Sequence, residues 1–241
     1  MTSVLETKSV LKRYRGHEVL KGVSLSVSGG EVVGILGPNG AGKTTCFYLI
    51  LGLLRPDGGD VFFDGKPIGA LPVWRRARQG IGYLPQEPSI FMRLTVMENI
   101  LAILELHEPS RSKRFSRLEA ILFTLRIGHL ADQQAASLSG GERRRVEIGR
   151  ALALSPRFML LDEPFAGVDP LAVADIQGAV ALLAKEGIGV LITDHNVRET
   201  LGVCDRAYIL EEGRLLAQGA PQDLVQDDKV RRAYLGEHFR L

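Results

Sequence analysis

The stretch "GPNGAGKTT", Gly37 to Thr45, decides the fold. It matches the pattern GxxxxGK[ST] in full, with a β-branched apolar run before it at Glu31–Leu36 and an apolar helical segment after it at Lys43–Leu53. Its glycines let the backbone turn so that several N–H groups point at phosphate oxygens, and the helix start adds its positive end. The sequence therefore predicts a phosphate-binding loop between a buried strand and a helix.

The side chains of this loop suit a nucleotide and its metal ion. Lys43 is a flexible positive charge that can reach the β- and γ-phosphates. Thr44 offers a hydroxyl to Mg²⁺, a hard ion that prefers oxygen ligands. We expect the whole loop to contact the nucleotide, through Gly37, Pro38, Asn39, Gly40, Ala41, Gly42, Lys43, Thr44 and Thr45.

An acidic pair follows a second apolar strand. "FMLLDEP" places Asp162 and Glu163 where that strand ends, and ligands of α/β sheets bind outside the carboxyl ends of the strands. Consecutive strand residues point in opposite directions, so Asp162 can face a metal ion while Glu163 faces a water molecule. Phosphoryl transfer needs both an oriented nucleophile and a metal ion.

Strand and helix patterns alternate along the chain, which is typical of an α/β protein. Three short runs are typical of buried strands: "GIGYLPQ", "RFMLLDEP" and "GIGVLITDH". Two segments are typical of hairpins: "GDVFFDG" and "RAYILEEGRLLAQG". Between Glu87 and Pro156 the pattern becomes helical, with Thr95 as the cap of one helix and Glu98 at the capping-box position. "SRLEAILFTLRI" reads as a second helix, and Pro109–Arg117 before it as an exposed connection.

The third helix of this region has an unusual start, "LSGGERRRVE", Leu138 to Glu147. Ser139 and Glu142 have the spacing of a capping box. Two glycines nevertheless stand in the first turn, where each costs about 1 kcal/mol relative to alanine. The sequence therefore predicts that Gly140 and Gly141 meet a requirement other than helix stability. The arginines at 143–145 point to different helix faces, so we expect them to be solvated or paired.

Composition limits the classes of function. A chain of 241 residues with 45% hydrophobic and 24% charged residues is typical of a soluble globular protein. A net charge of +2 is too small to indicate nucleic-acid binding, and no apolar run approaches the ~18 residues of a membrane span. No signal segment is apparent, and Cys46 and Cys204 lack metal-ligand spacing. We therefore predict a cytoplasmic protein whose two cysteines are buried.

The order of the motifs resembles that of the ATP-binding-cassette (ABC) ATPases, over essentially the whole chain. "LSGGE" lies between the phosphate-binding loop and the acidic pair, as the family's signature does. Gln86 follows "GIGYLP" like the glutamine of the family's Q-loop, and "GVD", ending at Asp169, follows the acidic pair like its D-loop. His195 ends "VLITDH" like the switch histidine, and Tyr14 matches the aromatic residue that stacks on adenine.

The resemblance implies a fold and a mechanism. The fold is a P-loop NTPase (RecA-like) α/β core, here 1–87 and 157–241, with an antiparallel β subdomain and an inserted α-helical subdomain at 88–156, all within one ABC ATPase domain. Two copies face head to tail as a homodimer and hydrolyse ATP with Mg²⁺. The implied roles are a general base (Glu163), a γ-phosphate contact (His195), metal contacts (Thr44, Gln86, Asp162), a link between sites (Asp169) and phosphate contacts to the partner's ATP (Ser139, Gly140, Gly141).

The resemblance also implies membrane partners. "FAGVDP", "DHNVRE" and "YLGEHFRL" are most similar to the cassettes that power lipopolysaccharide extraction from the inner membrane and export. In such transporters a groove near the position of Phe91 takes a short coupling helix from the membrane subunits, here two transmembrane permease subunits that are LptF/LptG-like. The chain would then lie peripherally on the cytoplasmic face of the inner membrane, with membrane contact only through partners.

Three other functions stay open at this stage. A branched-chain amino-acid importer shares the layout and differs in its membrane partner. A soluble ABC ATPase of the iron–sulfur assembly type would stay off membranes. ABC proteins that act on nucleic acid carry long coiled-coil insertions or two cassettes, whereas this chain has one phosphate-binding loop and no sustained heptads, so we expect no direct nucleic-acid contact.

Overall fold

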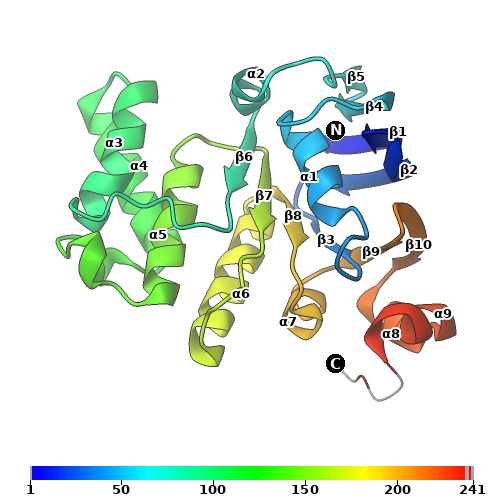
Figure 1. The fold of residues 1–241 in the computed structure, drawn as a ribbon. Coiled ribbons are helices and arrows are strands. Elements are labelled where there is room, and N and C mark those ends of the chain that lie inside the picture. Colours follow the sequence, from blue (N-terminus) through cyan, green and yellow to red (C-terminus); the bar gives the residue numbers. More distant parts are fainter. Residues whose placement is uncertain (1, 237–238, 240–241) are drawn as a thin grey trace.

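A six-stranded sheet forms the centre of the computed structural model, which describes residues 2–236 and 239 (Figure 1). Its strand order is β10-β9-β3-β8-β7-β6, parallel except for the β9–β10 hairpin. The strands are β3 (Val32–Leu36), β6 (Ile81–Leu84), β7 (Phe158–Asp162), β8 (Gly189–Thr193), β9 (Arg206–Glu211) and β10 (Arg214–Gly219). Because β3, β7 and β8 are buried on both faces, their sequences are continuous apolar runs without alternation.

Successive residues of these strands enter two different cores. Val33 and Ile35 of β3 pack with α1 (Lys43–Leu51), through side chains such as Phe47. Met159 of β7 and Val190 of β8 point to the other face, where they pack with α6 (Pro170–Lys185). The sheet is therefore a middle layer, and the loops at the carboxyl ends of its parallel strands lie along one edge.

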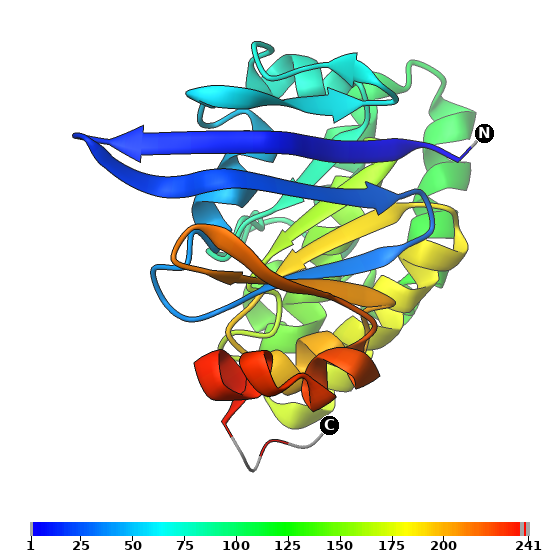
Figure 2. The same ribbon diagram turned by 90° about the vertical axis from the view of Figure 1, so that its right-hand side faces the viewer.

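A second, antiparallel sheet lies over α1 (Figures 1 and 2). Its strands, in the order β2-β1-β4-β5, are β1 (Val4–Tyr14), β2 (His17–Ser28), β4 (Gly58–Phe63) and β5 (Lys66–Pro67). The predicted hairpins at "GDVFFDG" and at β9–β10 both form.

Helices fill the chain between β6 and β7, on the left of Figure 1. They are α3 (Val96–His107), α4 (Arg111–Thr124) and α5 (Gly140–Leu152), with short turns η1 (Gly128–Leu130) and η2 (Ala135–Ser137). Both predicted capping boxes are present, at Thr95 with Glu98 and at Ser139 with Glu142. The limits 88–156 of the insertion stay a prediction.

The prediction of an exposed connection at Pro109–Arg117 is wrong. Helix α4 begins at Arg111, five residues before Ser116, where the predicted helix starts. Ser110 caps α4 by accepting a hydrogen bond from the Lys113 N–H. The prediction took the basic residues of this segment as a sign of a loop, but exposed residues can also lie on a helix. Arg111 and Lys113 of α4 are exposed. Leu118 and Ile121 of the same helix are buried. Polar composition therefore indicated the surface correctly and the backbone wrongly.

The remaining elements close the C-terminal side of the core. They are α7 (Val197–Leu201), α8 (Pro221–Gln226), α9 (Asp228–Val230) and η3 (Arg231–Leu235), and they pack with β9 and β10. Cys46 and Cys204 are both free and buried, as predicted. Among the described residues, no helix combines the length and the apolar character needed to cross a membrane.

A buried arginine joins α1 to α2 (Val73–Arg78). The guanidinium of Arg76, 1% exposed, donates to the carbonyls of Leu49 and Ile50 at the end of α1, at 2.6 and 2.7 Å, and to those of Gly69 and Leu71, both at 2.9 Å. Burial lowers its pKa to about 10, so it stays charged at neutral pH. A cation among the last carbonyls of a helix is favoured by the helix dipole.

Replacing Arg76 therefore tests how α1 is held. Arg76→Met keeps the volume and removes every donor, which leaves buried carbonyls unsatisfied. We expect a loss of about 3 kcal/mol in the free energy of unfolding, measured by urea titration. The control Arg75→Met changes an exposed arginine of the same helix and should shift the midpoint little; equal midpoints for the two variants would contradict this role.

Candidate functional site

The phosphate-binding loop connects β3 to α1 and is shaped by two glycines. Gly37 has φ 145°, and a Cβ there would lie 2.1 Å from the Leu210 carbonyl oxygen. Gly42, the N-cap of α1, has φ 100°, and its Cβ would lie 2.7 Å from the Leu20 side chain. Both positions therefore require glycine for conformation and for space.

Lys43 reaches back across this loop. Its ammonium donates to the carbonyls of Gly37 at 2.7 Å and Pro38 at 3.0 Å. Burial lowers the pKa of Lys43, while the negative charges of Glu163 and Asp194 raise it. The pocket around the loop is lined by Val19, 39–45 and Glu163. Thr44 is exposed there, at the start of α1.

The acidic pair ends β7 in two contrasting environments. Asp162 is 6% exposed and accepts hydrogen bonds from the hydroxyls of Thr193 at 2.8 Å and Tyr83 at 3.4 Å. Burial raises the pKa of Asp162, with the Thr193 hydrogen bond opposing it and the charge of Glu163 adding to it. Glu163 has φ 44°, a left-handed conformation that turns the chain directly after the strand.

This turn brings three predicted residues together. The Gln86 side-chain amide donates to the Glu163 carboxylate at 2.7 Å, and His195 Nδ1 lies 3.4 Å from the same oxygen, Oε2. Gln86 is the second residue after the end of β6, and His195 is the second residue after the end of β8. These two strands flank β7 on either side, so they bring both side chains to the edge where Glu163 lies. Gln86, Glu163 and His195 therefore converge beside the phosphate-binding loop, since Glu163 also lines its pocket.

The two glycines of "LSGGE" have different surroundings. A Cβ on Gly141 would lie 2.4 Å from the Ala172 Cβ, because α5 packs closely against α6. A Cβ on Gly140 would meet nothing within 4 Å. Ser139 accepts a hydrogen bond from the Glu142 N–H at 3.3 Å and donates to the Glu142 carboxylate at 2.7 Å. Helix packing thus requires Gly141, whereas Gly140 leaves the helix start open.

Other predicted residues lie apart from the phosphate-binding loop. Tyr14, at the end of β1, is 43% exposed, and Asp169 caps α6 by accepting from the Ala172 N–H at 3.1 Å. Neither lines the loop pocket in the part of the chain that the structure describes, and the same holds for Ser139 to Gly141. Their contacts with nucleotide stay predictions.

Phe91 lies on the surface beside a groove between α3, α5 and β6. It is 47% exposed, and the Arg150 guanidinium lies 4.3 Å from its ring centroid. The buried amide of Asn99 fixes its backbone through hydrogen bonds with both the N–H and the carbonyl of Phe91. The groove is lined by residues that include Ser89, Arg150 and the exposed Leu106 and Leu154.

Sequence reasoning missed a buried ion pair at the junction of these segments. Arg144 bonds Glu147 at 3.1 Å, the Pro85 carbonyl at 2.7 Å and the Asp162 carbonyl at 3.1 Å. Glu147 in turn accepts from the Ser89 N–H at 2.6 Å. The i,i+3 spacing of Arg144 and Glu147 was the available signal.

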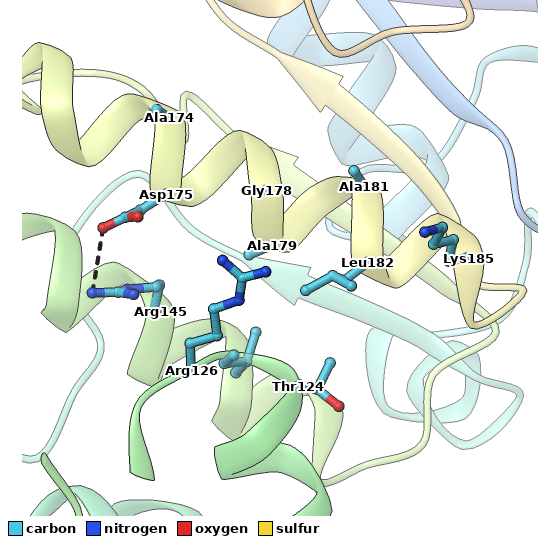
Figure 3. A pocket seen from close by; sticks show the side chains of 11 residues that line it. Thr124, Arg126, Arg145, Ala174, Asp175, Gly178, Ala179, Ala181, Leu182 and Lys185 are labelled. Atoms are coloured by element: carbon cyan, nitrogen blue, oxygen red, sulfur yellow. Dashed lines mark ion pairs between the residues drawn. The ribbon is translucent and has the colours of Figure 1, made fainter. Parts of the chain in front are cut away.

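The prediction that the three arginines of α5 are solvated or paired is confirmed. Besides the Arg144 ion pair, Arg143 donates to the Leu138 carbonyl at 3.3 Å and Arg145 pairs with Asp175 at 3.4 Å. The Arg145–Asp175 pair borders a separate pocket between the end of α4 and α6, into which Arg126 extends (Figure 3).

Another missed residue is Asp194, which is fully buried next to His195. It accepts from the N–H groups of Phe165 at 2.9 Å and Asn196 at 2.8 Å, and Oδ1 lies 3.6 Å from His195 Nδ1. Burial raises the pKa of Asp194, while these hydrogen bonds lower it. An acid directly after a buried strand was the same signal that identified Asp162.

Comparison with known families matches residues 20–166 to the ABC transporter family model. The chain belongs to the ABC ATPase family. It is 55% identical over 241 residues, all of both chains, to a "lipopolysaccharide export system ATP-binding protein" of Acidithiobacillus ferridurans. It is 54% identical over 240 residues to the protein so named in Escherichia coli K12, with 99% of this chain and 100% of that one covered.

Structural similarity agrees with this membership. The ADP-bound conformation of an ATP-binding cassette of an ABC transporter superposes with a TM-score of 0.86 at 34% identity, covering 98% of this chain and 100% of the other. Residues 214–240 also match a family model described as a branched-chain amino acid ATP-binding cassette transporter. The predicted fold class, a P-loop core with an antiparallel β subdomain and an inserted helical subdomain, is confirmed. The chain is an ATPase that uses ATP with Mg²⁺.

The buried charge of Asp162 gives a test by pH. Because its pKa is higher in the folded chain than in the unfolded one, the folded state binds the proton more tightly, and ionisation therefore costs stability at neutral pH. We expect Asp162→Asn to raise the urea midpoint at pH 7, and this gain to shrink as the pH falls through the raised pKa towards about 4. Asp132→Asn, an exposed control, should show neither effect; a lower midpoint for Asp162→Asn at pH 7 would disprove the argument.

Proposed function

We propose that the chain is the ATP-hydrolysing subunit of a lipopolysaccharide exporter and works as a head-to-tail homodimer. The observation that carries hydrolysis is the convergence of Gln86 and His195 on the carboxylate of Glu163, beside the Lys43 loop. The relatives named for lipopolysaccharide export, similar along their full length, support the transported substrate.

The residues present fit a magnesium nucleotide. Thr44 and Gln86 offer neutral oxygens and Asp162 a carboxylate, and oxygen ligands are what Mg²⁺ prefers. When bound, the ion would neutralise charge on the phosphates and polarise them. In this proposal Gly37 to Thr45 cradle the phosphates through backbone N–H groups, Lys43 exchanges the Gly37 and Pro38 carbonyls for phosphate oxygens, and Tyr14 stacks on adenine.

Glu163 acts as general base in this proposal. Gln86 and His195, which both contact its carboxylate, orient it towards the attacking water. His195 would also contact the γ-phosphate. Gln86 also begins the loop that leads to Ser89 and Phe91, so a change at the nucleotide has a short covalent route to the groove.

The open start of α5 supports the second half of the site. Gly140 leaves the helix N–H groups uncovered, and the positive end of α5 suits an anion. Since 139–141 do not line the pocket of their own phosphate-binding loop, the phosphate they bind belongs to the ATP of the partner subunit. Asp169, next to α6 and its contact with Gly141, would link the two sites.

Glu163→Gln tests the base. The amide keeps the size and cannot accept the proton, so we expect ATP hydrolysis to fall by at least about 100-fold, the effect typical of general-base loss, while ATP binding remains. The closed dimer should accumulate with ATP in size-exclusion chromatography. Glu119→Gln on the surface of α4 is the control. Undiminished phosphate release by Glu163→Gln would reject this assignment.

Phe91 tests the partner groove. Phe91→Ala removes an exposed ring and its cation–π contact with Arg150, and we expect weaker co-purification with the membrane subunits and nearly unchanged ATPase activity of the isolated chain. Phe123→Ala removes a more exposed ring, 85%, on α4 and should leave co-purification unchanged. Equal retention of partners by both variants would remove Phe91 from the interface.

Affinity purification from detergent-solubilised membranes tests which class of transporter the chain belongs to. Two different permease chains with large periplasmic domains, LptF/LptG-like, would support lipopolysaccharide export and a position on the cytoplasmic face of the inner membrane. Amino-acid permeases would instead favour an importer, the alternative suggested by the C-terminal match at 214–240. Soluble scaffold proteins would point to the iron–sulfur assembly type and reject the proposal.

A further inference from the structure

The single tryptophan of the chain lies on the surface, away from the nucleotide site. Trp74 in α2 is 53% exposed, and the guanidinium groups of Arg75 and Arg78 each lie 5.1 Å from its ring centroid. Both arginines are exposed as well. Exposed apolar groups that cluster on a surface mark interaction sites, and nothing in the hydrolytic site uses this ring.

Apolar side chains accompany this ring. Val73, beside it in α2, is 39% exposed, and Leu53, just after α1, is 50% exposed. The buried Arg76 ties the two segments together through its hydrogen bonds to the end of α1. Both views place α2 at the top edge of the molecule (Figures 1 and 2). Leu53, Val73, Trp74, Arg75 and Arg78 together are called the Trp74 patch below.

We propose that the Trp74 patch binds the surface of a lipid bilayer through anionic phospholipid headgroups. Tryptophan is suited to this boundary because its apolar ring carries one polar N–H. Arginine can lay its stem along apolar groups while its guanidinium meets a phosphate. All the charged residues of α2 are arginines, so the helix carries no negative charge that would repel an anionic headgroup.

The position of the patch fits the orientation that a membrane partner would impose. Leu154 lines the groove beside Phe91, and three residues later the Arg157 N–H donates to the carbonyl of Gly80, just after α2, at 2.7 Å. A permease seated in the groove would therefore hold α2 next to the bilayer. Only this orientation rests on the proposed function. The inference departs from the expectation that the chain meets the membrane only through partners.

Vesicle binding by the purified full chain tests this directly. Because Trp74 is the sole tryptophan, its emission reports on the patch alone. With vesicles of equimolar phosphatidylcholine and phosphatidylglycerol we expect co-sedimentation and a blue shift of this emission. Added salt should weaken both effects, since the attraction to an anionic surface is screened. Vesicles of phosphatidylcholine alone should produce little of either.

Charge reversal gives the matched comparison. Arg75→Glu with Arg78→Glu should lower the partition coefficient roughly 25-fold or more, at about fivefold for each basic residue lost near an anionic surface. Arg111→Glu with Lys113→Glu makes the same change in charge on α4, where Arg111 also lies over an exposed ring, that of Phe115. This control should keep the binding. ATPase activity of the isolated chain should be unchanged in both variants.

Several outcomes would overturn the proposal. They are an absence of binding to the anionic vesicles, binding without a shift of the Trp74 emission, and an equal loss in both double variants. If vesicles do not bind but Arg75→Glu with Arg78→Glu loses the permease subunits, the patch is a protein contact instead. Because the vesicles hold no permease, these results leave the proposed export function untouched, and recovery of a different permease would leave vesicle binding untouched.

Discussion

The buried guanidinium of Arg144 is the point on which the functional segments depend. It lies on α5 a few residues after "LSGGE", and it bonds at once to the carbonyl of Pro85, the carbonyl of Asp162 and the carboxylate of Glu147. The signature helix, the segment that carries Gln86 and the strand that carries the acidic pair are therefore held by one side chain. Their relative positions cannot change unless these bonds exchange.

The energetics of this junction favour coupled motion over independent motion. Burial lowers the pKa of Arg144, and the charge of Glu147 opposes that shift, so the pair persists because each partner compensates the other. Removing one partner of a buried pair typically costs about 3–5 kcal/mol, since the other charge is left unpaired. Glu147 also accepts from Ser89, two residues before Phe91. These bonds connect α5 directly to the segment that leads to the groove.

Residue patterns predicted the parts of the fold that local physics determines. The glycines at 37 and 42, the capping boxes at Thr95 and Ser139 and the doubly buried strands all follow from conformation or periodicity within a few residues. Contacts between segments that are distant in the sequence could not be predicted from such local patterns. Arg76, which caps α1 from another helix, reads in the sequence as one more surface arginine. Gly141 was expected to serve a phosphate, whereas its closest constraint is the Ala172 side chain of α6.

The residues of the candidate hydrolytic site include several features that lower the stability of the fold. Glu163 adopts a left-handed backbone conformation, and Asp162 and Asp194 are carboxyls whose pKa values burial raises. Each feature disfavours folding, and each lies at the carboxyl end of β7 or β8. Clusters of strain and perturbed acids are typical of functional sites because structure elsewhere compensates for them. Here the central sheet compensates, because a hydrophobic core packs against each of its two faces and holds the strand ends in place despite their strain. A positive charge bound at this edge would relieve the repulsion between Asp162 and Glu163, so binding of a cation there would stabilise the ends of these strands.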